Sequence, residues 1–137
     1  NELGAAVDAK GWIARNGEIV VQDGQLSLGQ GKKGKGQAPF LVRNQLNLAG
    51  PVTATVRLKS SEAGELAFAW REDGQQDFLA ASRVAIKLAA SEQWQTHEIK
   101  IPAQSDLIHL RVQMPAEKTR IVGLKLIPSS GKTVTLW

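Results

Sequence analysis

The residues of this chain best suited to chemistry are basic, since 17 lysines and arginines against 13 acids give its 137 residues a net charge of +4. Three of them, Lys32, Lys33 and Lys35, lie in the glycine-rich segment 31–36. A glycine-rich backbone that carries three ammonium groups is suited to holding the sulfate or carboxylate groups of a glycan. The alternative is a loop whose lysines only keep the protein in solution.

A second basic group follows from strands in which apolar and polar residues alternate, since alternate side chains point to opposite faces of a sheet. If the apolar side chains point inward, the outward ones include Arg57, Arg71, Arg83, Lys87, His109 and Arg111. The short side chains between them are Thr53, Thr55, Ala67, Ala69 and Ala85. Long basic side chains around a shallow floor suit an acidic or sulfated polysaccharide. The alternative is an ordinary solvated face whose charges prevent edge-to-edge strand pairing.

The four tryptophans divide by their surroundings. Trp70 shares a face with apolar neighbours, and Trp94 opens an extended segment, so both are expected to pack inside the fold. Trp12 lies in a polar segment and Trp137 is the last residue, so both are expected to be partly exposed, unless they cap the fold. Stacking on a sugar needs an exposed aromatic face, which makes Trp12 the better candidate platform.

Two segments resemble nucleotide-binding motifs in residue type but lack the other features that those motifs require. Segment 29–34 fits G-x-G-x-x-G, but segment 35–39 cannot begin the helix that would hold a pyrophosphate. Segment 130–133 resembles the end of a phosphate loop, yet Leu126 stands where its first glycine is required. Neither motif therefore predicts a cofactor.

Catalytic and metal-binding patterns are also lacking. The sequence has no G-x-S-x-G elbow, no cysteine and only two histidines, which supports neither a nucleophilic triad nor a zinc site. Carboxylate pairs such as Glu65 with Asp77 or Glu98 are formally available for glycoside hydrolysis, but most acids lie in turns, where solvation explains them. We predict no catalytic residue, no metal and no cofactor.

The elements that must position the basic residues are short strands. Alternation is clear over 52–59, 65–71, 83–88 and 108–113, and Asp23-Gly24 is a hairpin signal between 18–21 and 25–28. Other extended segments are 40–43, 45–48, 94–101, 121–127 and 133–137, with a bulge in 94–101 where the parity changes. Only 77–82 has any helical character. The pattern predicts an all-β fold: a two-sheet antiparallel β-sandwich of the jelly-roll or galactose-binding-like type.

Length and composition predict one domain over residues 1–137, without repeats or a linker. No apolar run is long enough to span a membrane. The first residue is Asn1 and no signal peptide is recognisable, so we expect a fragment excised from a larger secreted enzyme.

Segments 20–28, 92–102, 108–112 and 121–127 resemble strands of carbohydrate-binding-module-like sandwiches. With 50–54 and 68–71, the chain is also similar to the carboxy-terminal accessory domain of secreted bacterial sulfatases of the N-acetylgalactosamine-6-sulfatase type. This resemblance implies a jelly-roll-like fold and a secreted, periplasmic or cell-surface setting. It implies no sulfatase catalysis, because the C-x-P-x-R or S-x-P-x-R motif is missing.

The sequence thus predicts a non-catalytic carbohydrate-binding-type accessory module that directs an attached sulfatase or glycosidase to an anionic polysaccharide. The alternative is a structural domain that packs on the parent catalytic domain and stabilises it. Nucleic acid is disfavoured as a partner, because basic and aromatic residues form no ladder. The candidate ligand-binding residues are Trp12, Lys32, Lys33, Lys35, Arg57, Arg71, Arg83 and Arg111.

Overall fold

The computed structural model describes residues 9–30 and 38–137. Within these ranges the chain forms strands and turns and no helix, so no described helix is long and apolar enough to cross a membrane. The lysine segment 31–36 lies outside the described residues, and the roles predicted for Lys32, Lys33 and Lys35 therefore stay predictions.

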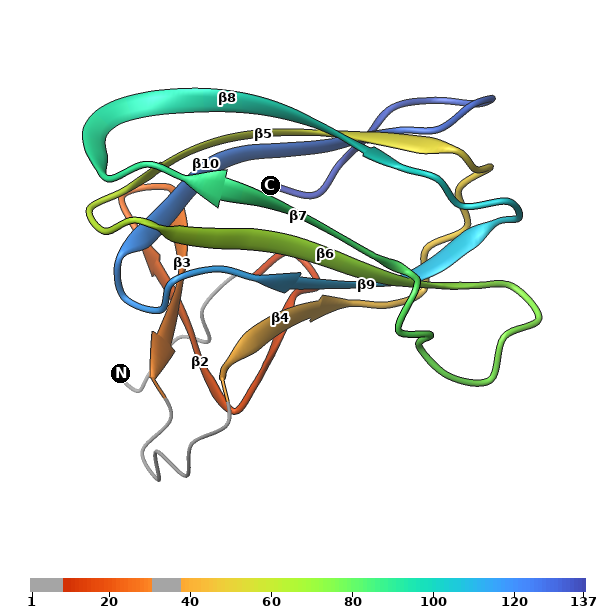
Figure 1. Ribbon diagram of the computed structural model, residues 1–137, viewed down its shortest axis with the longest axis horizontal. Coiled ribbons are helices and arrows are strands. Elements are labelled where there is room, and N and C mark those ends of the chain that lie inside the picture. The colour runs from red at the N-terminus through yellow and green to blue at the C-terminus, as the bar shows by residue number, and fades with distance from the viewer. Residues whose placement is uncertain (1–8, 31–37) are drawn as a thin grey trace.

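The described strands form two antiparallel sheets that pack face to face as two layers (Figure 1). The five-stranded sheet has the order β1-β4-β9-β6-β7, and the six-stranded sheet has the order β2-β3-β10-β5-β8, with β11 beside β10. The strands are β1 (Ile13–Arg15), β2 (Gly17–Gln22), β3 (Gln25–Gln30), β4 (Phe40–Arg43), β5 (Val52–Ser60), β6 (Gly64–Glu72), β7 (Arg83–Leu88), β8 (Ser91–Ile101), β9 (Leu107–Gln113), β10 (Thr119–Ile127) and β11 (Val134–Thr135). The predicted two-sheet antiparallel β-sandwich is confirmed.

Alternation in the sequence sets which side chains fill the space between the sheets. Along β6, Leu66, Phe68 and Trp70 are buried, whereas Glu65 and Arg71 point outward. The β2–β3 hairpin turns at Asp23 and Gly24, with φ of 55° and 72°, the left-handed pair that a tight hairpin requires. Period-two burial and this turn together fix the register, because a slip of one residue would move every apolar side chain to the solvent face.

Three segments differ from the predicted strands. Segment 45–48 is not a strand, and only Leu48 forms an isolated bridge, with Leu107. The bulge predicted within 94–101 is not found there, because 95–101 pair without interruption with 52–58. The register shift lies earlier, between Ser91 and Gln95, where β8 has two extra residues opposite Leu58 and Ser60. The carboxy-terminal strand is shorter than expected and comprises only Val134–Thr135.

The predictions for three of the four tryptophans are wrong. Trp12 and Trp137 are only 3% and 7% exposed, because the two ends of the described chain pack together: Trp12 Nε1 donates to the Leu136 carbonyl at 3.0 Å, and Trp137 Nε1 to that of Gly24. Trp12 therefore offers no open face for a sugar. Trp94 is only half-buried, because it lies out of phase with the buried Ile99 and Ile101 of β8, and the Lys59 ammonium lies 4.6 Å from the centroid of its ring. Trp70 is buried as expected.

Candidate functional site

The outer face of the five-stranded sheet brings most of the predicted arginines together. Backbone register places Val42, Arg111, Ala69 and Arg83 in one row across β4, β9, β6 and β7. Arg71 and His109 form the next pair along β6 and β9. We call this surface the arginine face; its outward basic residues are Arg15, Arg71, Arg83, Lys87, His109 and Arg111.

Arg111, at the centre of this face, contacts two phenylalanine rings. Its Cζ lies 3.8 Å from the centroid of Phe78 and 5.1 Å from that of Phe40. Phe40 comes from β4, on one side of β9, and Phe78 from the loop between β6 and β7. A guanidinium stacked on an aromatic face loses much of its rotational freedom, so Arg111 is held in place before any ligand arrives.

The β6–β7 loop, residues 73–82, is itself fastened to the end of β6. It projects from one end of the sandwich (Figure 1). Arg71 Nη1 donates to the Gln75 carbonyl at 2.5 Å, and the backbone N–H of Glu72 donates to Gln75 Oε1 at 3.0 Å. Because Phe78 lies three residues beyond Gln75, these bonds fix the start of the segment that carries the ring against Arg111.

Glu72 joins this loop to the turn before β9. Its buried carboxylate accepts hydrogen bonds from Trp70 Nε1 at 3.1 Å, from the backbone N–H groups of Gln104 and Ser105, and from the Ser105 hydroxyl. Burial by itself raises the pKa of Glu72, but the bonds from Ser105, Trp70 and Gln104 outweigh it and hold the pKa below its ordinary value of 4.5. Glu72 is therefore an ionised structural group that positions the site.

His109 lies beneath the same surface. Its ring meets Phe78 edge to face, with 4.8 Å between centroids, and its Nε2 is buried without a partner among the described residues. Burial lowers the pKa of His109 below its ordinary value of 6.5, and the charges of Arg71, Arg111 and Arg15 lower it further. The imidazole is therefore neutral at neutral pH, and the positive charge of the face comes from its arginines and Lys87.

Two pockets of about 380 Å³ each flank Arg111. One is lined by Phe40, Ala69, Phe78, Leu79, Ala80, Arg83, Arg111 and Gln113. The other is lined by Arg15, Asn16, Phe40, Val42, Asn44, His109 and Arg111. Phe40 and Arg111 line both pockets, so the two pockets adjoin and form one surface hollow.

Arg83 and Arg57 differ from Arg111 in their surroundings. Arg83 Nη2 lies 2.7 Å from Glu65 Oε1, in an ion pair whose side chains are 44% and 54% exposed. Arg57 is exposed on β5, in the six-stranded sheet, so it lies on the opposite outer surface from the arginine face. The structure therefore brings Arg71, Arg83 and Arg111 together and separates Arg57 from them.

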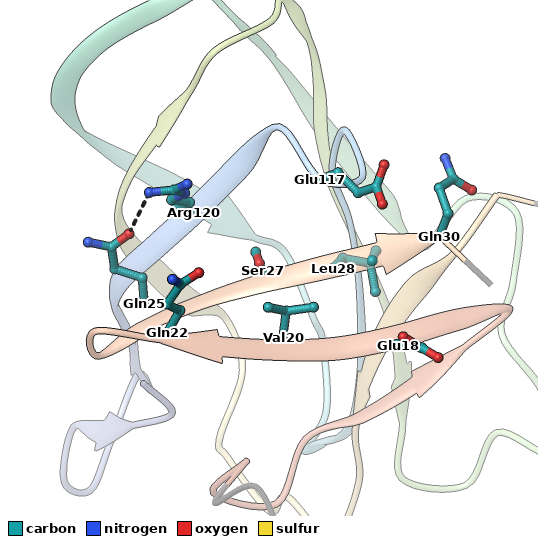
Figure 2. A pocket seen from close by; sticks show the side chains of 10 residues that line it. Glu18, Val20, Gln22, Gln25, Ser27, Leu28, Gln30, Glu117 and Arg120 are labelled. Carbon is teal, nitrogen blue, oxygen red and sulfur yellow. Dashed lines mark hydrogen bonds between the residues drawn. The ribbon is translucent and has the colours of Figure 1, made fainter. Parts of the chain in front are cut away.

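A pocket of about 280 Å³ lies on the six-stranded sheet, between β2, β3 and β10. Figure 2 shows Glu18, Gln30 and Glu117 toward one end and Gln25 and Arg120 at the other, where Arg120 Nη1 donates to Gln25 Oε1 at 3.4 Å. We call it the polar pocket. It has two carboxylates against one guanidinium and no aromatic ring, so it differs from the arginine face in both charge and surface chemistry.

Sequence reasoning missed Phe40 and Phe78, whose rings contact the central arginine. Phe40 was assigned only to a strand, and Phe78 falls in a segment with weak helical character. The available signal was Phe78 itself, an aromatic residue in the polar stretch between β6 and β7. No three acidic or histidine side chains in the described part of the chain lie close enough to hold a metal ion.

These features define a jelly-roll-type β-sandwich with a basic, partly aromatic hollow on one sheet. Compared by sequence, the chain matches no protein-family model and no curated protein.

Solved structures with this fold include several carbohydrate-binding modules. A CBM4 structure is similar with a TM-score of 0.63 at 10% identity, covering 89% of this chain and 90% of that one. A family 29 carbohydrate-binding module gives 0.60 at 14% identity, covering 88% and 80%. The C-terminal CBM6 of the laminarinase LamC from Zobellia galactanivorans gives 0.59 at 9% identity, covering 87% and 94%. At such identities the likeness establishes the fold and leaves the ligand to the chemistry of the site.

Proposed function

We propose that this domain is a non-catalytic carbohydrate-binding module that holds an anionic polysaccharide on its arginine face. The observation that carries the proposal is Arg111, fixed against Phe40 and Phe78 where two pockets meet. Arginine side chains bind sulfate and carboxylate groups through paired hydrogen bonds, and apolar surface beside them suits the C–H faces of sugar rings. The fold shared with carbohydrate-binding modules supports the same conclusion.

The charge of the arginine face favours an anionic over a neutral glycan. Among the outward strand residues of this face Glu65 is the only acid, against the basic side chains of Arg15, Arg71, Arg83, Lys87 and Arg111. Such an excess of one charge attracts a polyanion over a distance of about one Debye length, roughly 8 Å in physiological salt.

In this proposal the domain is attached to a secreted hydrolase, a sulfatase or a glycosidase, and raises the local concentration of substrate around it. The structure gives no support to the alternative role of stabilising a parent domain through an apolar surface near Trp12 or Trp137. Both rings are buried, and the large exposed apolar residues of the described chain, Ile13, Val20, Leu79 and Ile127, come from four different segments.

Affinity gel electrophoresis tests the proposed function. The 137-residue chain is run through native gels that contain sulfated, carboxylated or neutral polysaccharides. We expect retardation in at least one anionic gel and its loss in high salt, because the contacts are charge-assisted. Unchanged mobility in every gel would refute carbohydrate binding, and equal retardation by neutral and anionic polysaccharides would refute the role given to the arginines.

A further inference from the structure

We infer that the anionic group recognised at Arg111 is a carboxylate, so that the ligand is a polysaccharide rich in uronic acids rather than a sulfated one. This inference rests on the proposed function and names the substrate class of the same site. Uronate carboxylates and sulfate esters each carry one negative charge at neutral pH, so net charge alone does not distinguish them. The distinction comes from the way Arg111 is held.

Arg111 has one open edge. Its Nε is sealed from solvent and has no partner among the described residues, and no hydrogen bond joins Nη1 or Nη2 to any of them. The Phe78 ring, 3.8 Å from Cζ, is in van der Waals contact and covers one face of the guanidinium. A ligand therefore approaches in the plane of the group, along the edge formed by the two Nη atoms.

A planar partner fits this edge better than a tetrahedral one. A carboxylate places both oxygens in the guanidinium plane and accepts two parallel hydrogen bonds. A sulfate ester that uses two oxygens in the same way has its remaining oxygens above and below that plane. On the side covered by Phe78, an oxygen out of the plane meets an apolar ring, so it loses hydration without gaining a hydrogen bond.

The surroundings of Arg111 also suit a pyranose ring that carries a carboxylate. Ala69 provides a short floor between Arg111 and Arg83, which flank it in the same row, roughly 10 Å apart at two strand spacings. Leu79, 52% exposed, adds apolar surface at the pocket that Phe78 also lines. With its carboxylate at Arg111, a sugar can place its C–H face on Ala69 and Leu79, and the next acidic unit faces Arg83.

Isothermal titration calorimetry tests this inference with three oligosaccharides of equal length. They are an oligogalacturonate, its methyl ester and a sulfated oligogalactan of equal charge. We expect the oligogalacturonate to bind at least about tenfold more tightly than the sulfated ligand, the effect of roughly one charge-assisted hydrogen bond. The methyl ester should bind more weakly than either anion, because it has lost the charge.

Arg111→Lys tests whether the preference comes from the planar group. Lysine keeps the charge and loses the paired donors, so the preference for carboxylate over sulfate should fall to about one. Arg57→Lys is the matched control and should keep the wild-type preference, since Arg57 is exposed on β5, on the opposite outer surface from the arginine face.

The outcomes separate this inference from the proposed function. Sulfated ligand binding as tightly as the oligogalacturonate, or more tightly, would overturn the carboxylate assignment and leave anionic glycan binding intact. An unchanged preference in Arg111→Lys would also overturn it. No binding of any of the three ligands, together with unchanged mobility in every gel, would refute the proposed function itself.

Discussion

The two outer surfaces of the sandwich obey the same rule of alternation, and yet they differ in how their charged side chains are held. On the arginine face, Arg111 stacks on Phe78 and lies near Phe40, and Arg71 is bonded to the β6–β7 loop. In the polar pocket, the side-chain carboxylates of Glu18 and Glu117 have no hydrogen-bond or ion-pair partner among the described residues, and the Arg120 guanidinium has one hydrogen bond of 3.4 Å to Gln25. Charge is common to both surfaces, but only the arginine face is preorganised, which lowers the entropic cost of binding.

The largest effect is expected from removing the carboxylate that supports the arginine face. Glu72→Ala leaves the N–H groups of Gln104 and Ser105 and the Trp70 indole without their acceptor, which should lower the free energy of unfolding by about 3 kcal/mol. Glu92→Ala, at an exposed position of β8, should change it by less than about 0.5 kcal/mol. Urea denaturation measures both, and equal effects would contradict the structural role of Glu72.

The same carboxylate predicts a loss of stability in acid. The pKa of Glu72 is lower in the folded than in the unfolded chain, so its contribution is fully present above about pH 4.5 and is lost as the pH falls through the folded value. Urea denaturation of the wild type and of Glu72→Gln across this range should show a steeper decline for the wild type. Parallel curves would show that Glu72 does not contribute to the acid transition.

The next largest effect is expected on the affinity for the polysaccharide. Arg111→Ala should weaken binding of an acidic polysaccharide by about thirtyfold, the typical cost of truncating a central arginine. Arg57→Ala removes a charge of the same kind from the opposite surface and should alter affinity by no more than about twofold. Affinity electrophoresis ranks the two variants directly. If both lost affinity equally, the total charge of the domain would account for binding, and the comparison between the two surfaces would fail.

A smaller effect is expected from His109. Its pKa is below 6.5 in the folded chain, so the unfolded chain binds the proton first and the free energy of unfolding falls as the pH drops below about 6.5. His109→Gln removes the contribution of this imidazole to the pH dependence, so the free energy of unfolding of the variant should change less than that of the wild type between pH 7.5 and pH 5.5. Thermal unfolding at the two pH values tests this, and an equal decline in both proteins would contradict a neutral, buried imidazole.

The smallest effect concerns the ion pair at the rim. Glu65→Gln should change stability by less than about 1 kcal/mol, because both side chains are about half exposed. It should also raise affinity for an acidic ligand about twofold, since Glu65 no longer competes for Arg83. Calorimetry with the oligogalacturonate measures this gain, and weaker binding would show that Glu65 itself contacts the sugar.

The fold was predictable from the sequence because side-chain alternation and turn residues are local signals. The Asp23-Gly24 hairpin and the inward face of Leu66, Phe68 and Trp70 needed no knowledge of neighbouring strands. The burial of Trp12 was not predictable, because the carbonyl that accepts its indole hydrogen bond belongs to Leu136, which is 124 residues away in the sequence.

The site was predictable only in part, because it depends on the order of the strands and on a loop contact, and neither is a local signal. Arg71, Arg83 and Arg111 were identified by parity, but the order of strands decides that Arg57 lies on the other surface. The contact of Arg111 with Phe78 depends on how the β6–β7 loop folds back over β9, and no periodic pattern in the sequence indicates the conformation of that loop.

Chemical-shift mapping of the labelled domain with an oligogalacturonate tests the central claim most directly. We predict that the shifted backbone amides cluster on β4, β9 and β6 and in the loop 73–82, while β2 and β3 stay unperturbed. Shifts concentrated around the polar pocket, at Gln25, Ser27 and Arg120, would contradict the account and place the ligand on the opposite sheet.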